Sequence, residues 1–440
     1  MNLKILFLVV MTSIILHGCK DDNEIDYLEL SQSSFSNVSN EGETLRINVT
    51  SDMEWQVSQN VHWCTVTPST GSGNQTLVIQ IGVNTDNKER NATITVTPTT
   101  SSGTSKKIEI TQAAGNIAIE QYHYEVPVIF HVFYKDKSDP LQYVSQSRLT
   151  HILDVVNNLY QNSKMQSVDM NLTFTLATTD PNGKTMLQPG VEYISWPENY
   201  PIDCETFMND ETGKHVKYLW EPNSYINIMV YNFTEDPTSD ITILGISYLP
   251  YTQKGGNSLA GLQEISQAYL ELKNLKYPHC VSINSLFINE ESTETTYSNA
   301  DITTTLAHEL GHYLGLYHAF SENEHSTYDG CIDSDYCEDT PTYNKVKYDA
   351  DYMYIAMNEP ENFTFSYLAM RTNCLTDETF VSHNIMDYAI SWGDQFTPDQ
   401  CKRIRHVLNY SPLIPGPKKE TAATRTAPEG LVDLPIRTIK

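Results

Sequence analysis

The sequence contains few positive charges. Its 440 residues include 28 Lys and Arg against 55 Asp and Glu, which gives a formal net charge of −27 at pH 7. A surface of this sign repels a phosphate backbone, so the composition argues against nucleic acid as a partner. Such a charge also suits a soluble exported protein, and solubility alone is a sufficient explanation for it.

The hydrophobic run near the N-terminus is too short to cross a membrane. It extends from Ile5 to Leu16 and follows Lys4. Together with Cys19 it resembles a bacterial lipoprotein signal, which implies removal of residues 1–18 and attachment of lipid to Cys19. The lipid would anchor the protein to the membrane without spanning it.

The next residues, Lys20-Asp21-Asp22, resemble the surface-export signal of Bacteroidetes lipoproteins. This resemblance implies an exported protein at the outer membrane that faces outward, with residues 19–25 as a linker. The alternative is an ordinary secretion signal followed by a polar linker.

Cysteine is scarce, and no two of the eight cysteines form a CxxC pair. A cysteine-rich zinc site is therefore not expected. Cys64 stands alone in the N-terminal part and is expected to be a buried apolar residue. Six cysteines follow it, an even number that favours disulfides in an exported protein but leaves fifteen pairings open. These six are Cys204, Cys280, Cys331, Cys337, Cys374 and Cys401.

Residues 26–114 contain short runs in which apolar and polar residues alternate, separated by Ser, Asn, Gly and Thr. Runs of this kind are typical of the strands of a β-sandwich. They are Leu28–Leu30, Thr44–Val49, Leu77–Ile81, Ala92–Val96 and Lys107–Ile110. The first domain is therefore expected to be all-β.

The same region resembles the Bacteroidetes domain called BACON. The residues that carry this resemblance are Trp55, Trp63-Cys64-Thr65-Val66, Gly71, Asn84, Arg90 and Thr111-Gln112. The resemblance implies glycan binding, with Trp55 and Trp63 as possible platforms. The alternative, of at least equal weight, is a spacer that holds the rest of the chain away from the membrane. In so small a sandwich, both tryptophans are expected in the core.

After a linker at 115–125, strand and helix patterns alternate over residues 126–410. Strands are expected at 126–134, 171–178, 226–231, 244–249 and 281–288, and a helix at 146–160. This mixed order predicts a twisted sheet backed by helices. Residues 411–440 are rich in Pro, Thr and Lys and are expected to form a disordered tail.

The most informative segment runs from His308 to His318. His308 and His312 are four residues apart, so on a helix they lie on one face and can bind the same metal ion. Gly315 can adopt the left-handed conformation that turns the chain out of the helix. This turn would bring in His318 as a third ligand of Zn²⁺ and leave a fourth position for water. Glu309 is placed to accept a proton from that water, which predicts hydrolysis.

The residues around these ligands predict a helix. Leu306, Leu310 and Leu314 recur at helical spacing and can bury one face of it. Asp301 or Ser298 is the expected N-cap. The two histidines therefore lie on a predicted amphipathic helix and not in a disordered segment.

At this point the sequence resembles the metzincin metalloproteases, whose extended zinc motif has this form. The segment Asn384-Ile385-Met386-Asp387-Tyr388 resembles their methionine turn. The resemblance implies that Met386 supports the histidines from below and that Tyr388 helps to stabilise the tetrahedral intermediate. It also implies an α+β domain in which a twisted mixed sheet carries the zinc helix and the Met-turn. Outside this context, Met386 would be interpreted as core filler.

Among metzincins, the chain is most similar to the pappalysin-like group over about residues 120–410. The segments that carry this similarity are Val126–Phe133, Gly315–Phe320, Asp339-Thr340-Pro341 and Phe396–Gln400. The aromatic-rich insertion Tyr343–Arg371 departs from the pattern, so substrate preference is not carried over.

The pappalysin resemblance also implies that Cys331 or Cys337 pairs with Cys374, which would fix the loop between the zinc motif and the Met-turn. The acidic stretch Asp329–Asp339 is a candidate Ca²⁺ site, because hard cations prefer oxygen ligands. A solvated loop is the alternative. Among the histidines outside the motif, only His383 is expected near the site.

Taken together, the motifs predict a zinc-dependent endopeptidase that acts on protein or peptide substrates. One Zn²⁺ would be held by His308, His312 and His318, with Glu309 as general base and then general acid. The competing hypothesis is a glycan- or mucin-binding surface lipoprotein with a vestigial protease fold. The intact ligands and Glu309 argue against it. The Met-turn weakens a third hypothesis, a zinc hydrolase that is not a protease.

Overall fold

The computed structural model describes most of the chain after residue 26. The described ranges are 27–40, 42–59, 61, 64–81, 84, 89–100, 103–114, 123–161, 167–235, 242–255, 257–267, 269–293, 296–323, 326–388, 390–416, 418 and 427–440. The predicted signal, Cys19, the linker 19–25, most of the linker 115–125 and Trp63 lie outside them. Among the described residues, no helix combines the length and apolar character needed to cross a bilayer.

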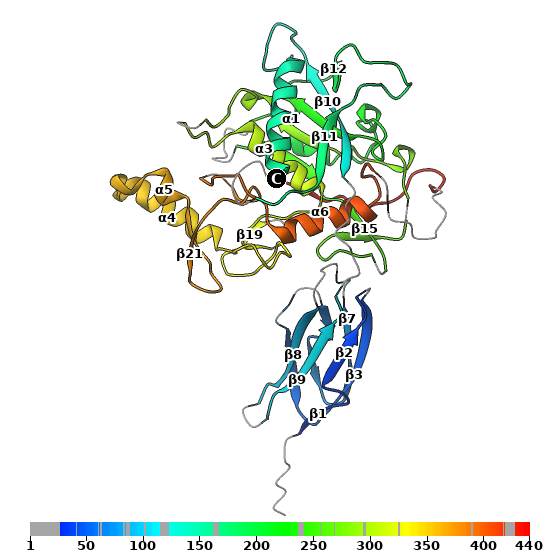
Figure 1. Ribbon diagram of the computed structural model, residues 1–440, viewed down its shortest axis with the longest axis vertical. Coiled ribbons are helices and arrows are strands. Elements are labelled where there is room, and N and C mark those ends of the chain that lie inside the picture. The colour runs from blue at the N-terminus through cyan, green and yellow to red at the C-terminus, as the bar shows by residue number, and fades with distance from the viewer. Residues whose placement is uncertain are drawn as a thin grey trace, which may run out of the picture.

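The N-terminal sandwich, residues 27–114, forms one lobe of the molecule (Figure 1). One sheet has the strand order β1-β3-β7-β5, and the other has the order β2-β9-β8-β4-β6. The strands are β1 (Leu28–Leu30), β2 (Ser34–Val38), β3 (Glu43–Ser51), β4 (Glu54–Gln59), β5 (Cys64–Thr67), β6 (Thr70–Ser72), β7 (Gln75–Ile81), β8 (Arg90–Pro98) and β9 (Lys106–Gln112). The expected all-β sandwich is confirmed.

Alternation of apolar and polar residues builds the core of this sandwich. Every second residue of the central part of β3 and β8 is buried. Ile47, Ile94 and Trp55 lie fully buried in one apolar cluster, which also contains Cys64. The indole nitrogen of Trp55 donates a hydrogen bond to the carbonyl of Gly73 at 3.1 Å. Trp55 is therefore a core residue and not a glycan platform.

The C-terminal lobe, residues 124–440, is built on a mixed sheet with the order β11-β10-β13-β17-β14-β22, in which β12 also pairs with β10. Its strands are β10 (Tyr124–Tyr134), β11 (Leu172–Leu176), β12 (Val191–Ser195), β13 (Ile226–Tyr231), β14 (Gly245–Tyr248), β17 (Val281–Asn284) and β22 (Thr438–Ile439). Only the pairs β14–β17 and β14–β22 are antiparallel. The α+β fold predicted for this region is confirmed.

The predicted strands occur in this sheet with small shifts of their ends, but β12 and β22 were not predicted. The strand expected at 281–288 ends early, because the Asn284 side chain accepts a hydrogen bond from the amide of Leu286. That bond starts the 3-10 turn η3 (Ser285–Phe287). The turn directs the chain toward the helix that carries the histidine motif.

Two helices pack together against the sheet. Helix α1 (Gln146–Tyr160) has the predicted bounds and is capped by Ser145, whose side chain accepts from the amide of Arg148. The Tyr160 hydroxyl donates to the carbonyl of Ala307, within α3 (Ile302–Tyr313), at 2.9 Å. This contact joins α1 to the helix with the histidine motif.

The remaining elements are short or peripheral. The helices are α2 (Cys204–Met208), α4 (Lys345–Asn358), α5 (Phe365–Leu368) and α6 (Pro398–Tyr410). The strands are β15 (Tyr251–Gln253), β16 (Gln263–Ile265), β18 (Glu322–Asn323), β19 (Ser326–Thr327), β20 (Met370–Thr372) and β21 (Thr379–Val381). The 3-10 turns are η1 (Val216–Tyr218), η2 (Leu272–Asn274) and η4 (Pro360–Asn362).

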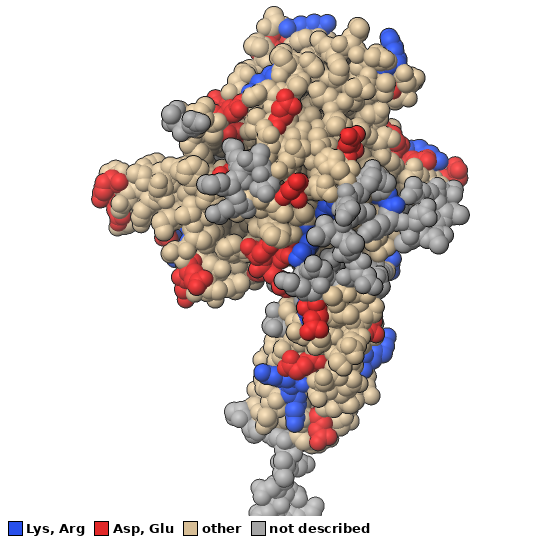
Figure 2. All heavy atoms as spheres, viewed as in Figure 1, with Lys and Arg blue, Asp and Glu red and all other residues tan. Residues whose placement is uncertain are grey.

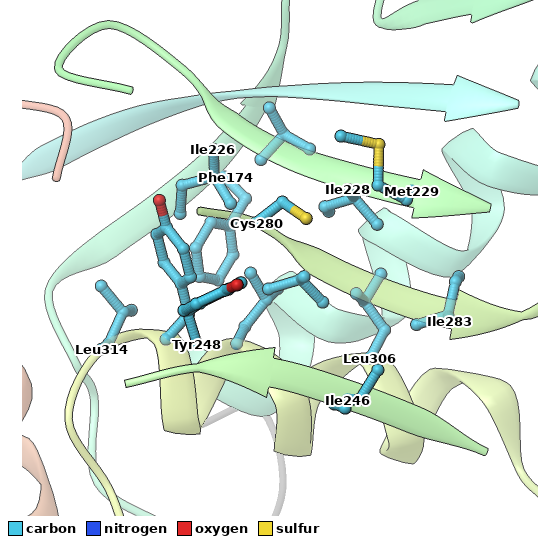
Figure 3. Packing of buried hydrophobic residues seen from close by; sticks show 14 of the residues in the cluster. Phe174, Ile226, Ile228, Met229, Ile246, Tyr248, Cys280, Ile283, Leu306 and Leu314 are labelled. Carbon is cyan, nitrogen blue, oxygen red and sulfur yellow. The ribbon is translucent and has the colours of Figure 1, made fainter. Parts of the chain in front are cut away.

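The main core lies between the sheet and α3. Figure 3 shows Ile228, Ile246 and Ile283 from three strands beside Leu306 from the helix, and all four are buried in one cluster. Cys280 lies in the same cluster, where burial raises the pKa of its thiol. The core therefore fixes α3 over β14 and β17, which places the first turns of the histidine motif.

The expectation of a disordered tail after Tyr410 is wrong for most of the described residues. Residues 427–440 return to the sheet, where β22 pairs with β14. Leu434 and Ile439 are buried. The prediction relied on the content of Pro, Thr and Lys and overlooked these apolar residues. In addition, the edge of β14 offers main-chain groups with which the tail residues pair. We call residues 427–440 the tail segment.

The insertion Tyr343–Arg371 forms α4, η4, α5 and the start of β20. In Figure 1, α4 and α5 project from one side of the C-terminal lobe. No residue of α4 is buried. Several of the insertion's apolar side chains are exposed, among them Met353, Tyr354, Met357, Phe363 and Tyr367.

Candidate metal centre

The helix that carries the motif begins at a well-formed cap. The Asp301 side chain accepts hydrogen bonds from the amides of Thr303 and Thr304, at 2.8 and 3.2 Å. This is one of the two expected caps. Leu306 and Leu310 are fully buried against the core. Their burial fixes the rotation of α3, so the histidine face of the helix turns toward the Met-turn.

The structure brings the three predicted histidines together. The Nε2 atom of His312 lies 2.9 Å from that of His308 and 3.1 Å from that of His318. All three side chains are buried, and their potential ligand atoms lie within 4.8 Å of one another. Among the described residues, this is the only group of three or more His, Cys, Asp or Glu side chains with such convergence.

The other nitrogen of each ring is held by an acceptor. His308 Nδ1 lies 2.8 Å from the carbonyl of Ile385, and His312 Nδ1 lies 2.9 Å from the carbonyl of Leu316. His318 Nδ1 lies 2.7 Å from the carboxylate of Glu322. A carbonyl or carboxylate oxygen only accepts, so each Nδ1 carries the proton.

This tautomer leaves three Nε2 lone pairs facing one another. Burial lowers the pKa of His308 from 6.5 to about 3, and the neighbouring His318 adds to the effect. Protonation of His308 therefore does not relieve the clash of lone pairs at neutral pH. A cation that accepts three nitrogen ligands does relieve it, so the residues fit a metal ion such as Zn²⁺.

The turn after the helix brings His318 to the other two rings. Gly315 has φ +94°, the left-handed conformation expected for it. Its carbonyl accepts two hydrogen bonds from the guanidinium of Arg403, at 3.2 and 3.0 Å. His318 then stacks on Phe320, with ring centroids 4.8 Å apart. The turn is therefore fixed by α6 as well as by the glycine.

Glu309 is buried beside the triad, and its Oε2 atom has no hydrogen-bond partner among the described protein groups. Burial raises the pKa of this carboxyl well above its usual value. Gly245, the first residue of β14, lies against it, because a Cβ at this position would be 2.5 Å from Glu309 Oε1. The sequence analysis did not single out Gly245, although a glycine within a strand pattern often marks a close approach of this kind.

The segment around Met386 lies directly against α3. A Cβ at Gly311 would be 2.5 Å from the Met386 sulfur, so any larger residue here would have to displace the Met386 side chain. The carbonyl of Met386 accepts a hydrogen bond from the amide of Ala319 at 3.0 Å. With the bond from His308 to Ile385, these contacts join this turn to the first and third histidines.

Asp387 anchors the same turn from behind, and the sequence analysis gave it no role. Its carboxylate accepts hydrogen bonds from the hydroxyls of Tyr343 and Ser382 and pairs with Arg371 at 3.3 Å. The side chains of Asp387 and Arg371 are both buried. The available signal was a charged residue between Met386 and Tyr388. Two of its partners, Tyr343 and Arg371, lie in the insertion, so spacing within the motif could not reveal them.

Tyr388 lies beside the triad. Its ring centroid is 4.5 Å from that of His318 and 6.0 Å from that of His308. Burial raises the pKa of its hydroxyl well above the usual value, so the group keeps its proton and can donate it in a hydrogen bond. In the structure, the hydroxyl donates to the main-chain oxygen of Lys440.

Cys331 and Cys374 form a disulfide, with their Cα atoms 5.6 Å apart. This is one of the two pairings that the resemblance implied, and the other, Cys337 with Cys374, does not occur. Cys337 is buried and unpaired, and burial raises the pKa of its thiol. The other free cysteines among the described residues are Cys64, Cys204, Cys280 and Cys401.

The acidic stretch Asp329–Asp339 forms no group of metal-suited side chains in the described part of the chain. Asp335 accepts hydrogen bonds from the amide of Cys337 and the hydroxyl of Thr340. The calcium site therefore stays a prediction. His383 is not part of the triad, because it lies 2.9 Å from an oxygen of Asp394 and stacks on Trp392.

Comparison with known families agrees with this arrangement. Residues 210–409 match the family described as pregnancy-associated plasma protein-A, and residues 27–114 match the family described as viral BACON domain. The resemblance to pappalysin-like metallopeptidases is therefore confirmed for the C-terminal lobe, as is the resemblance to BACON for the sandwich. A metallopeptidase family of this kind implies a catalytic metal.

Two curated relatives are each described as an extracellular metalloprotease. The proteins, from Arthroderma benhamiae and Trichophyton verrucosum, are each 36% identical over 112 residues, which cover 25% of this chain and 32% of the relative. The chain thus spans about a third of the length of these relatives. Mature mirolysin from Tannerella forsythia, solved with a cleaved peptide, is 21% identical with a TM-score of 0.43, covering 64% of this chain and 91% of that one. At these values, the likeness to mirolysin carries no inference about this chain.

Proposed function

We propose that this protein is a zinc-dependent endopeptidase. The observation that carries the proposal is the convergence of three buried Nε2 atoms, each with its Nδ1 held by an acceptor, beside a buried glutamate. A structural zinc site would close the metal with a fourth protein ligand, whereas a catalytic site keeps that position for water or substrate. The described residues supply three ligands and a potential base, which favours the catalytic kind.

Glu309 is the general base and acid of the proposed reaction. When bound, zinc would polarise the scissile carbonyl and lower the pKa of a bound water from ~15.7 toward about 7. Glu309 takes a proton from the attacking water at a carboxylate oxygen and passes it to the leaving amine. Its burial excludes bulk water, so that proton stays with the reacting groups.

Tyr388 is the proposed donor to the oxyanion. Burial keeps its hydroxyl protonated, and its ring packs beside His308 and His318. Asp387, held by Arg371, fixes the main chain that carries Tyr388. A preorganised donor of this kind stabilises the charge that develops in the transition state more than that of the ground state.

We also propose an exported lipoprotein, anchored through Cys19 and facing outward from the outer membrane. The N-terminal residues support this location. Figure 2 shows acidic side chains spread over both lobes on this face, in keeping with the net negative charge of the chain. Because Trp55 is buried, the role of the sandwich that we favour is a spacer.

Loss of labelled palmitate from a Cys19→Ala variant in cells would support the proposed lipid anchor, and its retention would contradict it.

The test of the proposed activity measures zinc content and casein hydrolysis together. The purified protein should hold about one zinc per chain and lose activity with a chelator, with recovery on adding zinc. His308→Ala should lose both metal and activity. A folded protein that holds no zinc, or casein hydrolysis that a chelator does not affect, would contradict the proposal. The vestigial alternative predicts zinc binding without hydrolysis.

A further inference from the structure

The tail segment lies along the outer edge of β14. Ser247 pairs with Ile439 and Tyr248 pairs with Thr438, in antiparallel register. The amide of Leu249 donates to the carbonyl of Arg437 at 3.0 Å. Because β14 begins at Gly245, against Glu309, the antiparallel tail runs toward the catalytic glutamate.

The last residue of this run reaches the proposed catalytic groups. The main-chain oxygen of Lys440 accepts a hydrogen bond from the hydroxyl of Tyr388. Its side-chain ammonium forms an ion pair with Glu205, the second residue of α2. One residue of the tail is thus held both at the proposed oxyanion donor and at the carboxylate of Glu205.

Contacts farther along the tail show that this position is built and not incidental. The Asn274 side chain donates to the carbonyls of Pro428 and Gly430, and the Tyr251 hydroxyl donates to that of Pro435. The Arg437 guanidinium donates to a main-chain oxygen. Leu434 and Ile439 are buried at 8% and 3% exposure, so the segment contributes core contacts as well as hydrogen bonds.

We infer that residues 434–440 occupy the peptide-binding edge of the site in the manner of a substrate, so that the chain carries its own competitor. Strand addition recognises any extended peptide through its main chain, while side-chain pockets select the sequence. Here the selecting group is Glu205, which pairs with the basic side chain of Lys440, the residue whose main-chain oxygen accepts from Tyr388. The substrate class is therefore a peptide with Lys or Arg at that residue.

The comparison of the tail with a substrate rests on the proposed function. The tail's position on the edge of β14 does not, because the contacts described above establish it. A segment tethered to the site is present at a high effective concentration, so a free peptide must displace it. The intact chain should thus bind and cleave free peptides less well than a chain whose tail has been released. Glu205 acts as a specificity-determining residue and takes no part in the chemistry.

The first experiment measures peptide binding in a Glu309→Gln background, in which no hydrolysis interferes. The probe is a fluorescein-labelled heptapeptide with the sequence of residues 434–440, and the readout is anisotropy. Ile439→Asp, which places a charge in the buried position, should raise the affinity for the probe about tenfold or more. The control is Asp433→Asn, whose side chain is 96% exposed and pairs with Lys276, and it should change nothing.

Lys440→Glu provides a second release variant, since this exposed residue can change without unfolding the lobe. It should raise probe affinity in the same direction by about fivefold. Unchanged affinity in this variant and in a folded Ile439→Asp protein overturns the inference. With Glu309 intact, a fall in casein hydrolysis for both tail substitutions also overturns it, because the tail would then be a structural part of the site.

The second experiment tests Glu205 by charge exchange. Glu205→Lys, combined with Ile439→Asp to free the edge, should bind the lysine-ended probe about fivefold less well and prefer a probe ending in Glu. A structural role for Glu205 would lower the affinity for both probes equally, which would overturn the specificity assignment. Tail-dependent probe binding in a protein that never hydrolyses casein keeps the occupancy and overturns the proposed function. Casein hydrolysis that no tail variant affects supports the proposed function and overturns the occupancy of the edge by the tail.

Discussion

The two lobes bury different kinds of side chain. Among the described residues of the sandwich, the buried polar side chains are those of Ser51, Asn84 and Gln112, and none of them is acidic or basic. The C-terminal lobe buries histidines, carboxylates and Arg371. Burial of an ionisable group costs stability unless the group is paired or neutral. The sandwich is thus organised mainly by apolar packing, whereas the C-terminal lobe also buries ionisable groups, among them the histidine triad and the Asp387–Arg371 pair.

The contrast between the two lobes is tested most directly by a substitution at Glu309. Glu309→Gln should lower kcat/KM for casein by about 10²–10⁴-fold while zinc content stays constant, because the base is lost and the ligands remain. Trp55→Ala should leave turnover unchanged and destabilise the sandwich by about 3–5 kcal/mol. Steady-state kinetics and urea unfolding measure the two effects. A comparable loss of turnover in Trp55→Ala would show that the lobes depend on each other.

The buried ion pair behind the Met-turn should give the next largest effect. Arg371→Met leaves the Asp387 carboxylate buried without its cation, which should lower the free energy of unfolding by about 3–5 kcal/mol. The double variant Arg371→Met with Asp387→Asn should recover part of this loss. Urea unfolding of all three proteins gives the coupling energy. Strictly additive effects would mean that the pair does not interact.

The contact between α3 and the Met-turn should tolerate substitution better than the Asp387–Arg371 pair does. Gly311→Ala places a methyl group 2.5 Å from the Met386 sulfur and should cost about 1–3 kcal/mol through overpacking. The shift should also weaken zinc binding, which competition with a chelating dye measures. Adding Met386→Ala should relieve the collision. Zinc affinity and stability at wild-type levels in Gly311→Ala would show that the two elements are loosely packed.

The smallest effect concerns pH. Burial lowers the pKa of His279 to about 3, below the value near 6.5 expected when the chain unfolds. The unfolded state therefore binds the proton more readily, and stability is lost as pH falls from about 6.5 toward 3. Between pH 7 and pH 5 this amounts to about 2 kcal/mol.

The measurement compares His279→Phe with the exposed-site control His123→Gln. The slope of unfolding free energy against pH should flatten in His279→Phe and stay unchanged in the control. If both variants keep the parent slope, His279 does not control the acid sensitivity of the lobe.

The sequence predicted those parts of the molecule that depend on local pattern. Alternation located the sandwich strands β1, β3, β7, β8 and β9 but not β2, β4, β5 and β6, and the helix predicted at 146–160 has the bounds of α1. The histidine motif predicted the convergence of its three rings, because helix geometry and one glycine determine it. These features depend on neighbours within a few residues.

The features that were not predicted depend on contacts between distant segments. Asp387 and Arg371 meet only when the insertion folds back on the Met-turn. Gly245 matters only because β14 lies against Glu309. The tail segment was misjudged because its composition is polar while its pairing partner lies nearly two hundred residues earlier in the chain. Spacing within one segment carries no information about such pairs.

The short strand β22 also affects whether copies of this chain associate at high protein concentration. An uncovered edge strand is a template for pairing between copies, which leads to aggregation. With β22 in place, the rim of the sheet at β14 is already paired. A ligand that displaces the tail takes over that pairing, so the rim stays protected throughout the exchange. Variants with a released tail should therefore precipitate more readily at high concentration unless a peptide is supplied.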